Sequence, residues 1–117
     1  MKLIQLKENI NSDKIRYGYK SSFKCFLFVA GFRFTICLRI TKFLKTKNKL
    51  LYNVARLYLR QMSYKFGIDM YDSTVLGKGF YIGHFGGIVI NGGTQFGDNV
   101  NISQGVTIGR IKDGKHM

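Results

Sequence analysis

Two stretches of the sequence decide the fold: Leu76–Ile90, which reads LGKGFYIGHFGGIVI, and Phe96–Gly109, which reads FGDNVNISQGVTIG. Within each stretch an aliphatic or aromatic residue returns every six positions, and it is followed by glycine or another small or β-branched residue. These recurring residues are Leu76, Ile82, Ile88, Phe96, Ile102 and Ile108. Two extra residues separate the third of them from the fourth. A period of six is neither the 3.6 of a helix nor the two of a simple strand, and it indicates a repeat architecture.

Such a repeat predicts a coiled β structure. Each six-residue unit is expected to form one short strand and a tight turn, three units close a triangular coil, and stacked coils share a core of inward-pointing anchors. Asn91, Asn99 and Asn101 are suited to the corners, since asparagine tolerates left-handed backbone conformations. The alternative for this glycine-rich stretch is a phosphate-binding loop, but the Lys-Ser/Thr pair and the following helix pattern that such a loop requires are missing.

Residues upstream of the repeat have a helical period. Apolar residues from Phe23 to Phe43 recur every three to four positions and predict a helix capped by Ser21 or Ser22. A second helix is predicted over Lys49–Phe66. Its expected apolar face comprises Leu50, Leu51, Val54, Leu57, Tyr58, Gln61 and Met62. These stripes favour helix-to-helix core and subunit contact, while a membrane-surface helix remains the alternative.

The change of period sets the domain organisation. Gly67 stands where a helix C-cap is expected, at the end of the second predicted helix. We therefore predict an α+β chain with a basic helical region over 1–67 and the first coils of a parallel β-helix over 68–117, about two coils in all.

The charge of the chain divides at the same place. Of its 19 Lys and Arg residues, 15 precede residue 68, together with two of its six acidic residues, so the first part carries the whole net charge of +13. A basic block of this density favours a polyanionic neighbour such as an anionic membrane surface. Nucleic acid is the less favoured neighbour, because the aromatic residues follow a helical period and form no stacking face.

The remaining composition indicates an ordered protein of the cytoplasm. Cys25 and Cys37 lack metal-like spacing and a secretory signal, so free buried thiols are expected. The run without charged residues from Cys25 to Phe32 is far shorter than the ~20 residues of a membrane span, and residues 1–11 lack the apolar run of a signal peptide. We expect a cytoplasmic location, peripheral at the inner membrane face.

His84 is the candidate catalytic base. It lies two residues after the anchor Ile82, so its side chain is expected at or outside the coil wall. A neutral imidazole accepts a hydroxyl proton near neutral pH, provided that an acceptor holds its other ring nitrogen. Asp69, 15 residues earlier, is the candidate acceptor on a nearby edge, and Asp72 is its rival.

These elements together resemble the hexapeptide-repeat acetyltransferases of the serine acetyltransferase-like kind. The resemblance rests on Ile68-Asp69, on Gly83-His84-Phe85-Gly86-Gly87, on the two-residue slip, and on the run from Phe96 to Gly109. It covers residues 68–109 closely and the basic helices only in kind. It implies a left-handed parallel β-helix and a homotrimer or dimer of trimers, with active sites in clefts between adjacent β-helices.

The resemblance also implies a reaction. Acetyl-CoA is the implied acyl donor, with no metal, and the acceptor is a small molecule with a hydroxyl group. His84 would take the hydroxyl proton, Asp69 would orient His84, and the oxygen would attack the thioester directly. Ser103 has no base-like neighbour in the repeat and is not expected to act as a nucleophile. The donor site is expected mostly beyond Met117, with Gly109 as the one candidate contact before it.

Three departures from the family pattern bear on the substrate and on the length. Gly83 stands where serine-using members carry an aspartate, so a sugar hydroxyl of a polysaccharide precursor becomes the favoured acceptor, with serine as the other. Asp69 is followed by Met-Tyr-Asp rather than Ile-His-Pro. The chain also ends after about two coils, so the alternative to an enzyme is an inert stub that trimerises or binds a membrane surface. His116 is a weaker candidate for a second functional histidine.

Overall fold

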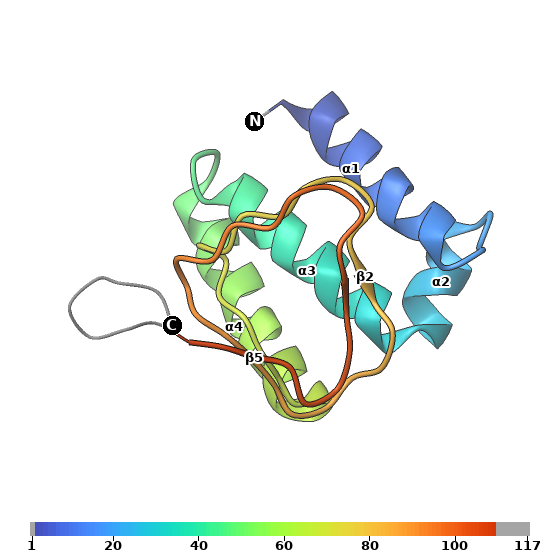
Figure 1. Ribbon diagram of the computed structural model, residues 1–117. Coiled ribbons are helices and arrows are strands. Elements are labelled where there is room, and N and C mark those ends of the chain that lie inside the picture. Colours follow the sequence, from blue (N-terminus) through green and yellow to red (C-terminus); the bar gives the residue numbers. More distant parts are fainter. Residues whose placement is uncertain (1, 110–117) are drawn as a thin grey trace.

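The computed structural model describes residues 2–109, in which helices precede short strands (Figure 1). The helices are α1 (Leu3–Arg16), α2 (Ser22–Phe28), α3 (Ala30–Leu44) and α4 (Lys49–Phe66), and the strands are β1 (Ile68–Asp69), β2 (Tyr81–Ile82), β3 (Ile88–Ile90), β4 (Asn101–Ile102) and β5 (Thr107–Ile108). The predicted α+β class is confirmed.

The strands wind into stacked triangular coils, which Figure 1 shows in a view along their common axis. Strands β1, β3 and β5 pair in parallel on one side of the triangle, and β2 pairs with β4 on another. Ile68 pairs with Ile88, 20 positions further on, whereas Ile90 pairs with Ile108, 18 positions further on. The first coil is therefore two residues longer than the regular 18. Ile82 pairs with Ile102 and Ile90 pairs with Ile108, so the step from β2 to β3 takes eight residues where the equivalent step from β4 to β5 takes six. The two extra residues predicted by the repeat are present, but they lie between Ile82 and Ile90, at the corner of His84, rather than between Ile88 and Phe96.

The six-residue anchors form the interior of the coils. Ile82, Ile88 and Ile102 are buried, and Leu76, Phe96 and Ile108 are partly buried against the same core. Within β3 the burial alternates, since Ile88 and Ile90 point inward while Val89 is exposed. The predicted inward orientation of the anchors is confirmed.

The helices cover the first end of the coils. In Figure 1, which looks along the coils, α3 is seen through the outline of the triangle and α4 along one of its sides. Phe34 and Leu38 of α3 join Leu59 and Phe66 of α4 in one core with the anchors of the repeat. Helix α4 then ends at Gly67, whose left-handed backbone (φ 63°, ψ 41°) reverses the chain into β1, as expected of a C-cap glycine.

Helix α4 buries a different face from the predicted one. The buried residues are Leu59, Met62 and Phe66, whereas Leu50 and Leu57 are 73% and 66% exposed. Leu51, Val54 and Tyr58 are also exposed. Of the apolar residues expected to face the helical core, only Met62 does so, because the coil end and α3 contact the side of α4 that lies next to the predicted stripe. The stripe itself is an unpartnered surface of the described chain.

The helix predicted to continue from Ser21 to Phe43 is broken in two. Ser21 caps α2 as expected, with its side chain accepting a hydrogen bond from the Lys24 N–H. Val29, however, has an extended backbone (φ −118°, ψ 107°) and ends α2. The guanidinium of Arg33 donates to the carbonyls of Phe26 and Leu27 at 3.0 and 3.3 Å, and so satisfies groups that a broken helix leaves open. Helix α1 is a further element that the sequence reasoning did not assign.

A buried ion pair joins α1 and α3 to the first coil. Arg39 donates to both carboxylate oxygens of Asp13, at 2.6 and 3.0 Å, and to the Gly77 carbonyl at 2.6 Å. Asp13 also accepts from the Phe80 N–H at 2.8 Å. The pair thereby satisfies two backbone groups of the coil edge that would otherwise lack a neighbouring strand.

Three more side chains form hydrogen bonds with backbone groups of the same coil edge. Arg16 donates to the carbonyl of Gly79 at 2.8 Å, the Gly79 N–H donates to Ser12, and the Ile82 N–H donates to the Tyr17 hydroxyl at 2.8 Å. Helix α1 thus takes the place of a preceding coil, because its polar side chains bond the outward edge of residues 77–82.

Candidate functional site

His84 lies on the corner that joins β2 to β3. Its side chain is exposed, as predicted from its position after Ile82. The imidazole stacks on the Phe85 ring, with centroids 5.4 Å apart, and Phe85 in turn contacts Phe66 at the end of α4. The ring is therefore held against the corner while its outer edge faces solvent.

The contacts of His84 select one tautomer. Its Nδ1 atom is 2.9 Å from the carbonyl oxygen of Phe85. A carbonyl only accepts hydrogen bonds, so this contact requires the proton on Nδ1 and leaves the lone pair on Nε2. A neutral imidazole in this state presents a base toward the outside of the coil.

Asp69 lies on the outer surface of β1. Ile68 is buried and Asp69 is exposed, so the carboxylate points away from the coil interior. The hydrogen bonds of residues 2–109 include none between Asp69 and His84, and the acceptor for Nδ1 is the Phe85 carbonyl. Asp69 lies at the start of the first coil and His84 at the last corner of that coil, with no hydrogen bond between their side chains. Their functional pairing stays a prediction.

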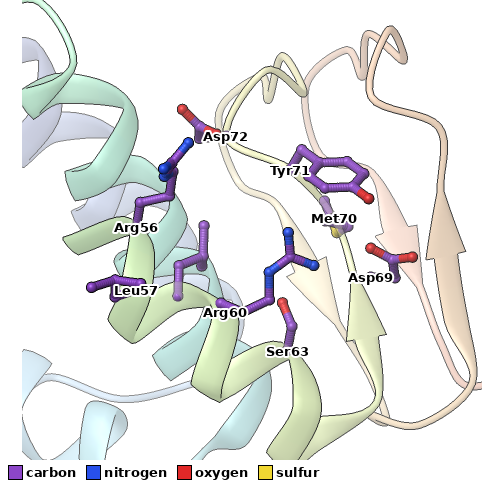
Figure 2. Close-up of a pocket in the computed structure, with 9 residues that line it drawn as sticks. Arg56, Leu57, Arg60, Ser63, Asp69, Met70, Tyr71 and Asp72 are labelled. Carbon is purple, nitrogen blue, oxygen red and sulfur yellow. The ribbon is translucent and has the colours of Figure 1, made fainter. Parts of the chain in front are cut away.

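Asp69 contributes to a hollow between α4 and the segment after Gly67 (Figure 2). The hollow has a volume of about 390 Å³. Its α4 wall carries Arg56, Arg60 and Ser63, and its opposite wall carries Asp69 and Asp72. A second hollow of about 300 Å³ shares Arg60, Ser63 and Asp69 and reaches Gly87 and Val89, beyond the corner of His84.

Arg60 is held in this hollow by aromatic rings. Its guanidinium carbon lies 5.9 Å from the centroid of the Tyr64 ring and 5.6 Å from that of Tyr71. The salt bridges of the described residues comprise only the Arg39–Asp13 pair, so Arg60 has no carboxylate within 4.0 Å among them. Sequence reasoning did not single out Arg60 or Tyr71, because a helix end separates them and no spacing rule connects the two.

The other candidates have structural contacts. Asp72 accepts a hydrogen bond of 2.9 Å from the Tyr52 hydroxyl. The Ser103 hydroxyl donates to the side chain of Gln104. Gly109 is exposed after β5. His116 lies outside the described residues, and the rest of the predicted donor site was expected beyond Met117.

The two cysteines are free and buried in the helical region. Burial raises the pKa of the Cys25 thiol to about 11 and that of the Cys37 thiol to about 11. Residues 2–109 contain no group of three or more His, Cys, Asp or Glu side chains arranged for a metal ion. None of the helices in this range combines the length and the apolar character needed to cross a membrane.

The fold and the outward-facing histidine together define a class: a left-handed β-helix of hexapeptide repeats preceded by a helical cap. No protein-family model matches the chain. Among curated proteins, it is 36% identical over 85 residues to serine acetyltransferase 1 of Arabidopsis thaliana, covering 73% of this chain and 26% of the relative. It is 29% identical over 100 residues to the serine acetyltransferase of Helicobacter pylori, covering 83% of this chain and 57% of the relative.

Solved structures give the same assignment. The serine acetyltransferase of Neisseria gonorrhoeae in complex with serine superimposes with a TM-score of 0.76 at 25% identity, covering 97% of this chain and 48% of that one. A serine acetyltransferase in complex with CoA gives 0.67 at 29% identity, covering 92% and 46%. The chain is a hexapeptide-repeat protein of the serine acetyltransferase-like type, and it spans about half the length, or less, of the relatives it matches.

Proposed function

We propose that the chain takes part in acetyl transfer from acetyl-CoA to the hydroxyl of a small acceptor. The observation that carries this proposal is the exposed His84 imidazole, whose Nδ1 contacts the Phe85 carbonyl and whose Nε2 makes no hydrogen bond within residues 2–109. Nε2 would remove the hydroxyl proton while the oxygen attacks the thioester carbon, and CoA would leave as its thiol. The likeness to relatives named serine acetyltransferases, one of them solved with CoA, supports this reaction class.

Serine and a sugar hydroxyl of a polysaccharide precursor are the two proposed acceptors. The relatives' name and the structure solved with serine support the amino acid. Gly83 supports the sugar, because the resembled family carries at this position an aspartate that could bind the ammonium group of serine. Transfer rates to serine and to nucleotide-linked sugars, compared under the same conditions, decide between the two.

We propose that the working unit is a trimer or a dimer of trimers. The resemblance of residues 68–109 to the hexapeptide-repeat acetyltransferases, whose active sites lie in clefts between adjacent β-helices, supports this. Later coils of the kind present in longer relatives would hold CoA. Sedimentation equilibrium of the chain gives its oligomeric state directly.

We propose further that the exposed face of α4 meets an anionic membrane surface from the cytoplasmic side. Leu50, Val54 and Leu57 are exposed on a helix that also carries Lys49, Arg56 and Arg60, and a basic helix with an open apolar side suits such a surface. Co-sedimentation with vesicles at low salt tests this, and equal binding to anionic and zwitterionic lipid would remove the proposal.

His84→Gln tests the central proposal. Release of CoA thiol is measured with serine and with sugar acceptors, and Ser103→Ala serves as the control at an exposed neighbouring corner. The protein's own thiols contribute little background, because both are buried and their pKa is raised to about 11. Loss of a general base lowers the rate by about 10² to 10⁴-fold, so His84→Gln should fall in that range while Ser103→Ala keeps its rate.

The same assay addresses the shorter length of the chain. This chain is compared with a form extended by further hexapeptide coils. Transfer that depends on His84 in either form supports the proposed reaction. Transfer by the extended form alone would mean that the present chain is the non-catalytic alternative, a stub that trimerises or binds a membrane surface. A transfer rate that His84→Gln leaves unchanged in both forms contradicts the role of His84.

A further inference from the structure

We propose that the hollow between α4 and the segment after Gly67 is an oxyanion subsite, in which Arg60 binds a carboxylate or phosphate group of the acceptor. This inference rests on the proposed acyl transfer at one point, namely that the ligand bound at Arg60 also carries the hydroxyl group that accepts the acetyl. The binding step itself depends on the geometry of Arg60 alone.

Two tyrosine rings lie close to the guanidinium of Arg60. Tyr64 lies one turn further along α4, and Tyr71 comes from the segment after β1, so rings from two elements face the same guanidinium at 5.9 and 5.6 Å. Cation–π attraction of this kind occupies none of the N–H donors, and Arg60 makes no hydrogen bond within residues 2–109. Figure 2 shows Arg60 reaching from α4 into the hollow toward the strand side.

Arg60 has no carboxylate partner among the described residues. Arg39, the arginine of the buried pair, uses its N–H groups on Asp13 and the Gly77 carbonyl. Arg60 makes no salt bridge within the described residues, although Asp69 lines the same hollow. A guanidinium without a carboxylate partner has its donors available for a bidentate contact with a planar carboxylate or a phosphate.

Polar side chains of both charges surround Arg60, since Asp69 and Asp72 line the wall opposite α4. The Ser63 hydroxyl and the guanidinium of Arg56 lie on the α4 wall with Arg60, and the volume of about 390 Å³ accommodates a small molecule rather than a single ion. The second hollow, of about 300 Å³, shares Arg60 with the first and is also lined by Gly87 and Val89, which follow the His84 corner. A ligand bound at Arg60 therefore has room to extend its hydroxyl end along this wall.

The subsite predicts which acceptors bind. Glycerate carries a carboxylate and a hydroxyl, serine adds an ammonium group, and ethanolamine keeps the hydroxyl and ammonium groups without the carboxylate. Inorganic phosphate and a sugar phosphate represent the other oxyanion source. Binding of glycerate and serine without phosphate identifies a carboxylate acceptor, whereas stronger binding of the sugar phosphate identifies a phosphorylated one.

Isothermal titration calorimetry with these compounds, on the whole chain at low ionic strength, tests the proposal. Arg60→Gln should weaken binding of the preferred oxyanion about tenfold or more, since hydrogen bonds to charged groups contribute on that scale. Lys65→Gln is the matched control, because it removes one positive charge from the last turn of α4 without lining either hollow. Arg60→Lys keeps the charge but loses the fork, and it should weaken binding less than Arg60→Gln.

Three outcomes would overturn the proposal: ethanolamine binding as tightly as glycerate, equal affinities in Arg60→Gln and Lys65→Gln, or no binding of any oxyanion to the unchanged chain. The thiol-release assay remains independent of these measurements. Acetyl transfer that persists in Arg60→Gln with an unchanged KM leaves the reaction standing and removes the subsite. Oxyanion binding without transfer leaves the subsite standing and removes the reaction.

Discussion

Arg39 and Arg60 show how differently the two sides of the molecule use the same residue type. Arg39 lies at the edge where α1 and α3 cover the first coil, it is buried, and its guanidinium is bonded to Asp13 and to Gly77. Arg60 lies on the outer wall, exposed between two tyrosine rings, with no carboxylate bonded to it among the described residues. The polar groups of the covered edge bond to one another and stabilise the fold, whereas Arg60 on the outer wall is available to a ligand.

The largest effect is expected from breaking the covered edge at Asp13. Asp13→Asn leaves the Arg39 charge buried without its counter-charge, and removing one partner of a buried pair costs about 3 kcal/mol or more. The free energy of unfolding from urea titration measures the loss. Glu8→Gln, an exposed change of the same chemistry in the same helix, should lie within about 0.5 kcal/mol of the unchanged chain. Similar midpoints for the two variants would show that the pair does not hold α1 to the coil.

A smaller effect is expected where two coils approach most closely. A Cβ atom at Gly77 would lie 2.2 Å from the Gly97 carbonyl oxygen, whereas a Cβ at Gly97 meets nothing within 4 Å. Gly77→Ala should therefore destabilise the chain by about 1 to 3 kcal/mol, the usual cost of forcing atoms into a packed site. Gly97→Ala, at the equivalent position of the next coil, is the control and should cause no loss. Thermal unfolding of both variants makes the comparison, and equal melting temperatures would contradict the close stacking.

The repeat was predictable from sequence because each anchor obeys a local rule. Ile82, Ile88 and Ile102 fall at six-residue spacing, and all three are buried. The sequence also predicted one longer step in the repeat, but it placed that step after Ile88, whereas the strand register of 20 residues places it between Ile82 and Ile90. The outward position of His84 and Asp69 on the coil wall was predictable for the same reason, since residues beside an inward anchor point outward.

The helical part was less predictable, because its buried faces depend on long-range partners. The pattern of α4 selects Leu50, Val54 and Leu57 as the core face, yet the coil end contacts Leu59 and Phe66 instead. The role of α1 rests on Ser12, Asp13 and Tyr17, which bond backbone groups more than 60 positions away. A single sequence gives no signal for such contacts, nor for the bond of His84 to the Phe85 carbonyl or the rings around Arg60.

The smallest effect is expected at Tyr17, whose hydroxyl bonds a single residue of the covered edge and also donates to the Ile82 carbonyl at 3.4 Å. The Tyr17 hydroxyl accepts from the Ile82 N–H at 2.8 Å, and burial raises the pKa of Tyr17, so the hydroxyl keeps its proton throughout the usual pH range. Tyr17→Phe keeps the ring and leaves this N–H of a buried residue without its acceptor, which costs about 1 to 2 kcal/mol. Tyr81→Phe is the matched control, since its ring packs on Tyr17 with centroids 4.6 Å apart and its hydroxyl makes no hydrogen bond within residues 2–109. If α1 does replace a preceding coil, amide exchange at Ile82 should accelerate in Tyr17→Phe and stay unchanged in Tyr81→Phe. Equal exchange in the two variants would mean that the edge is protected by packing alone.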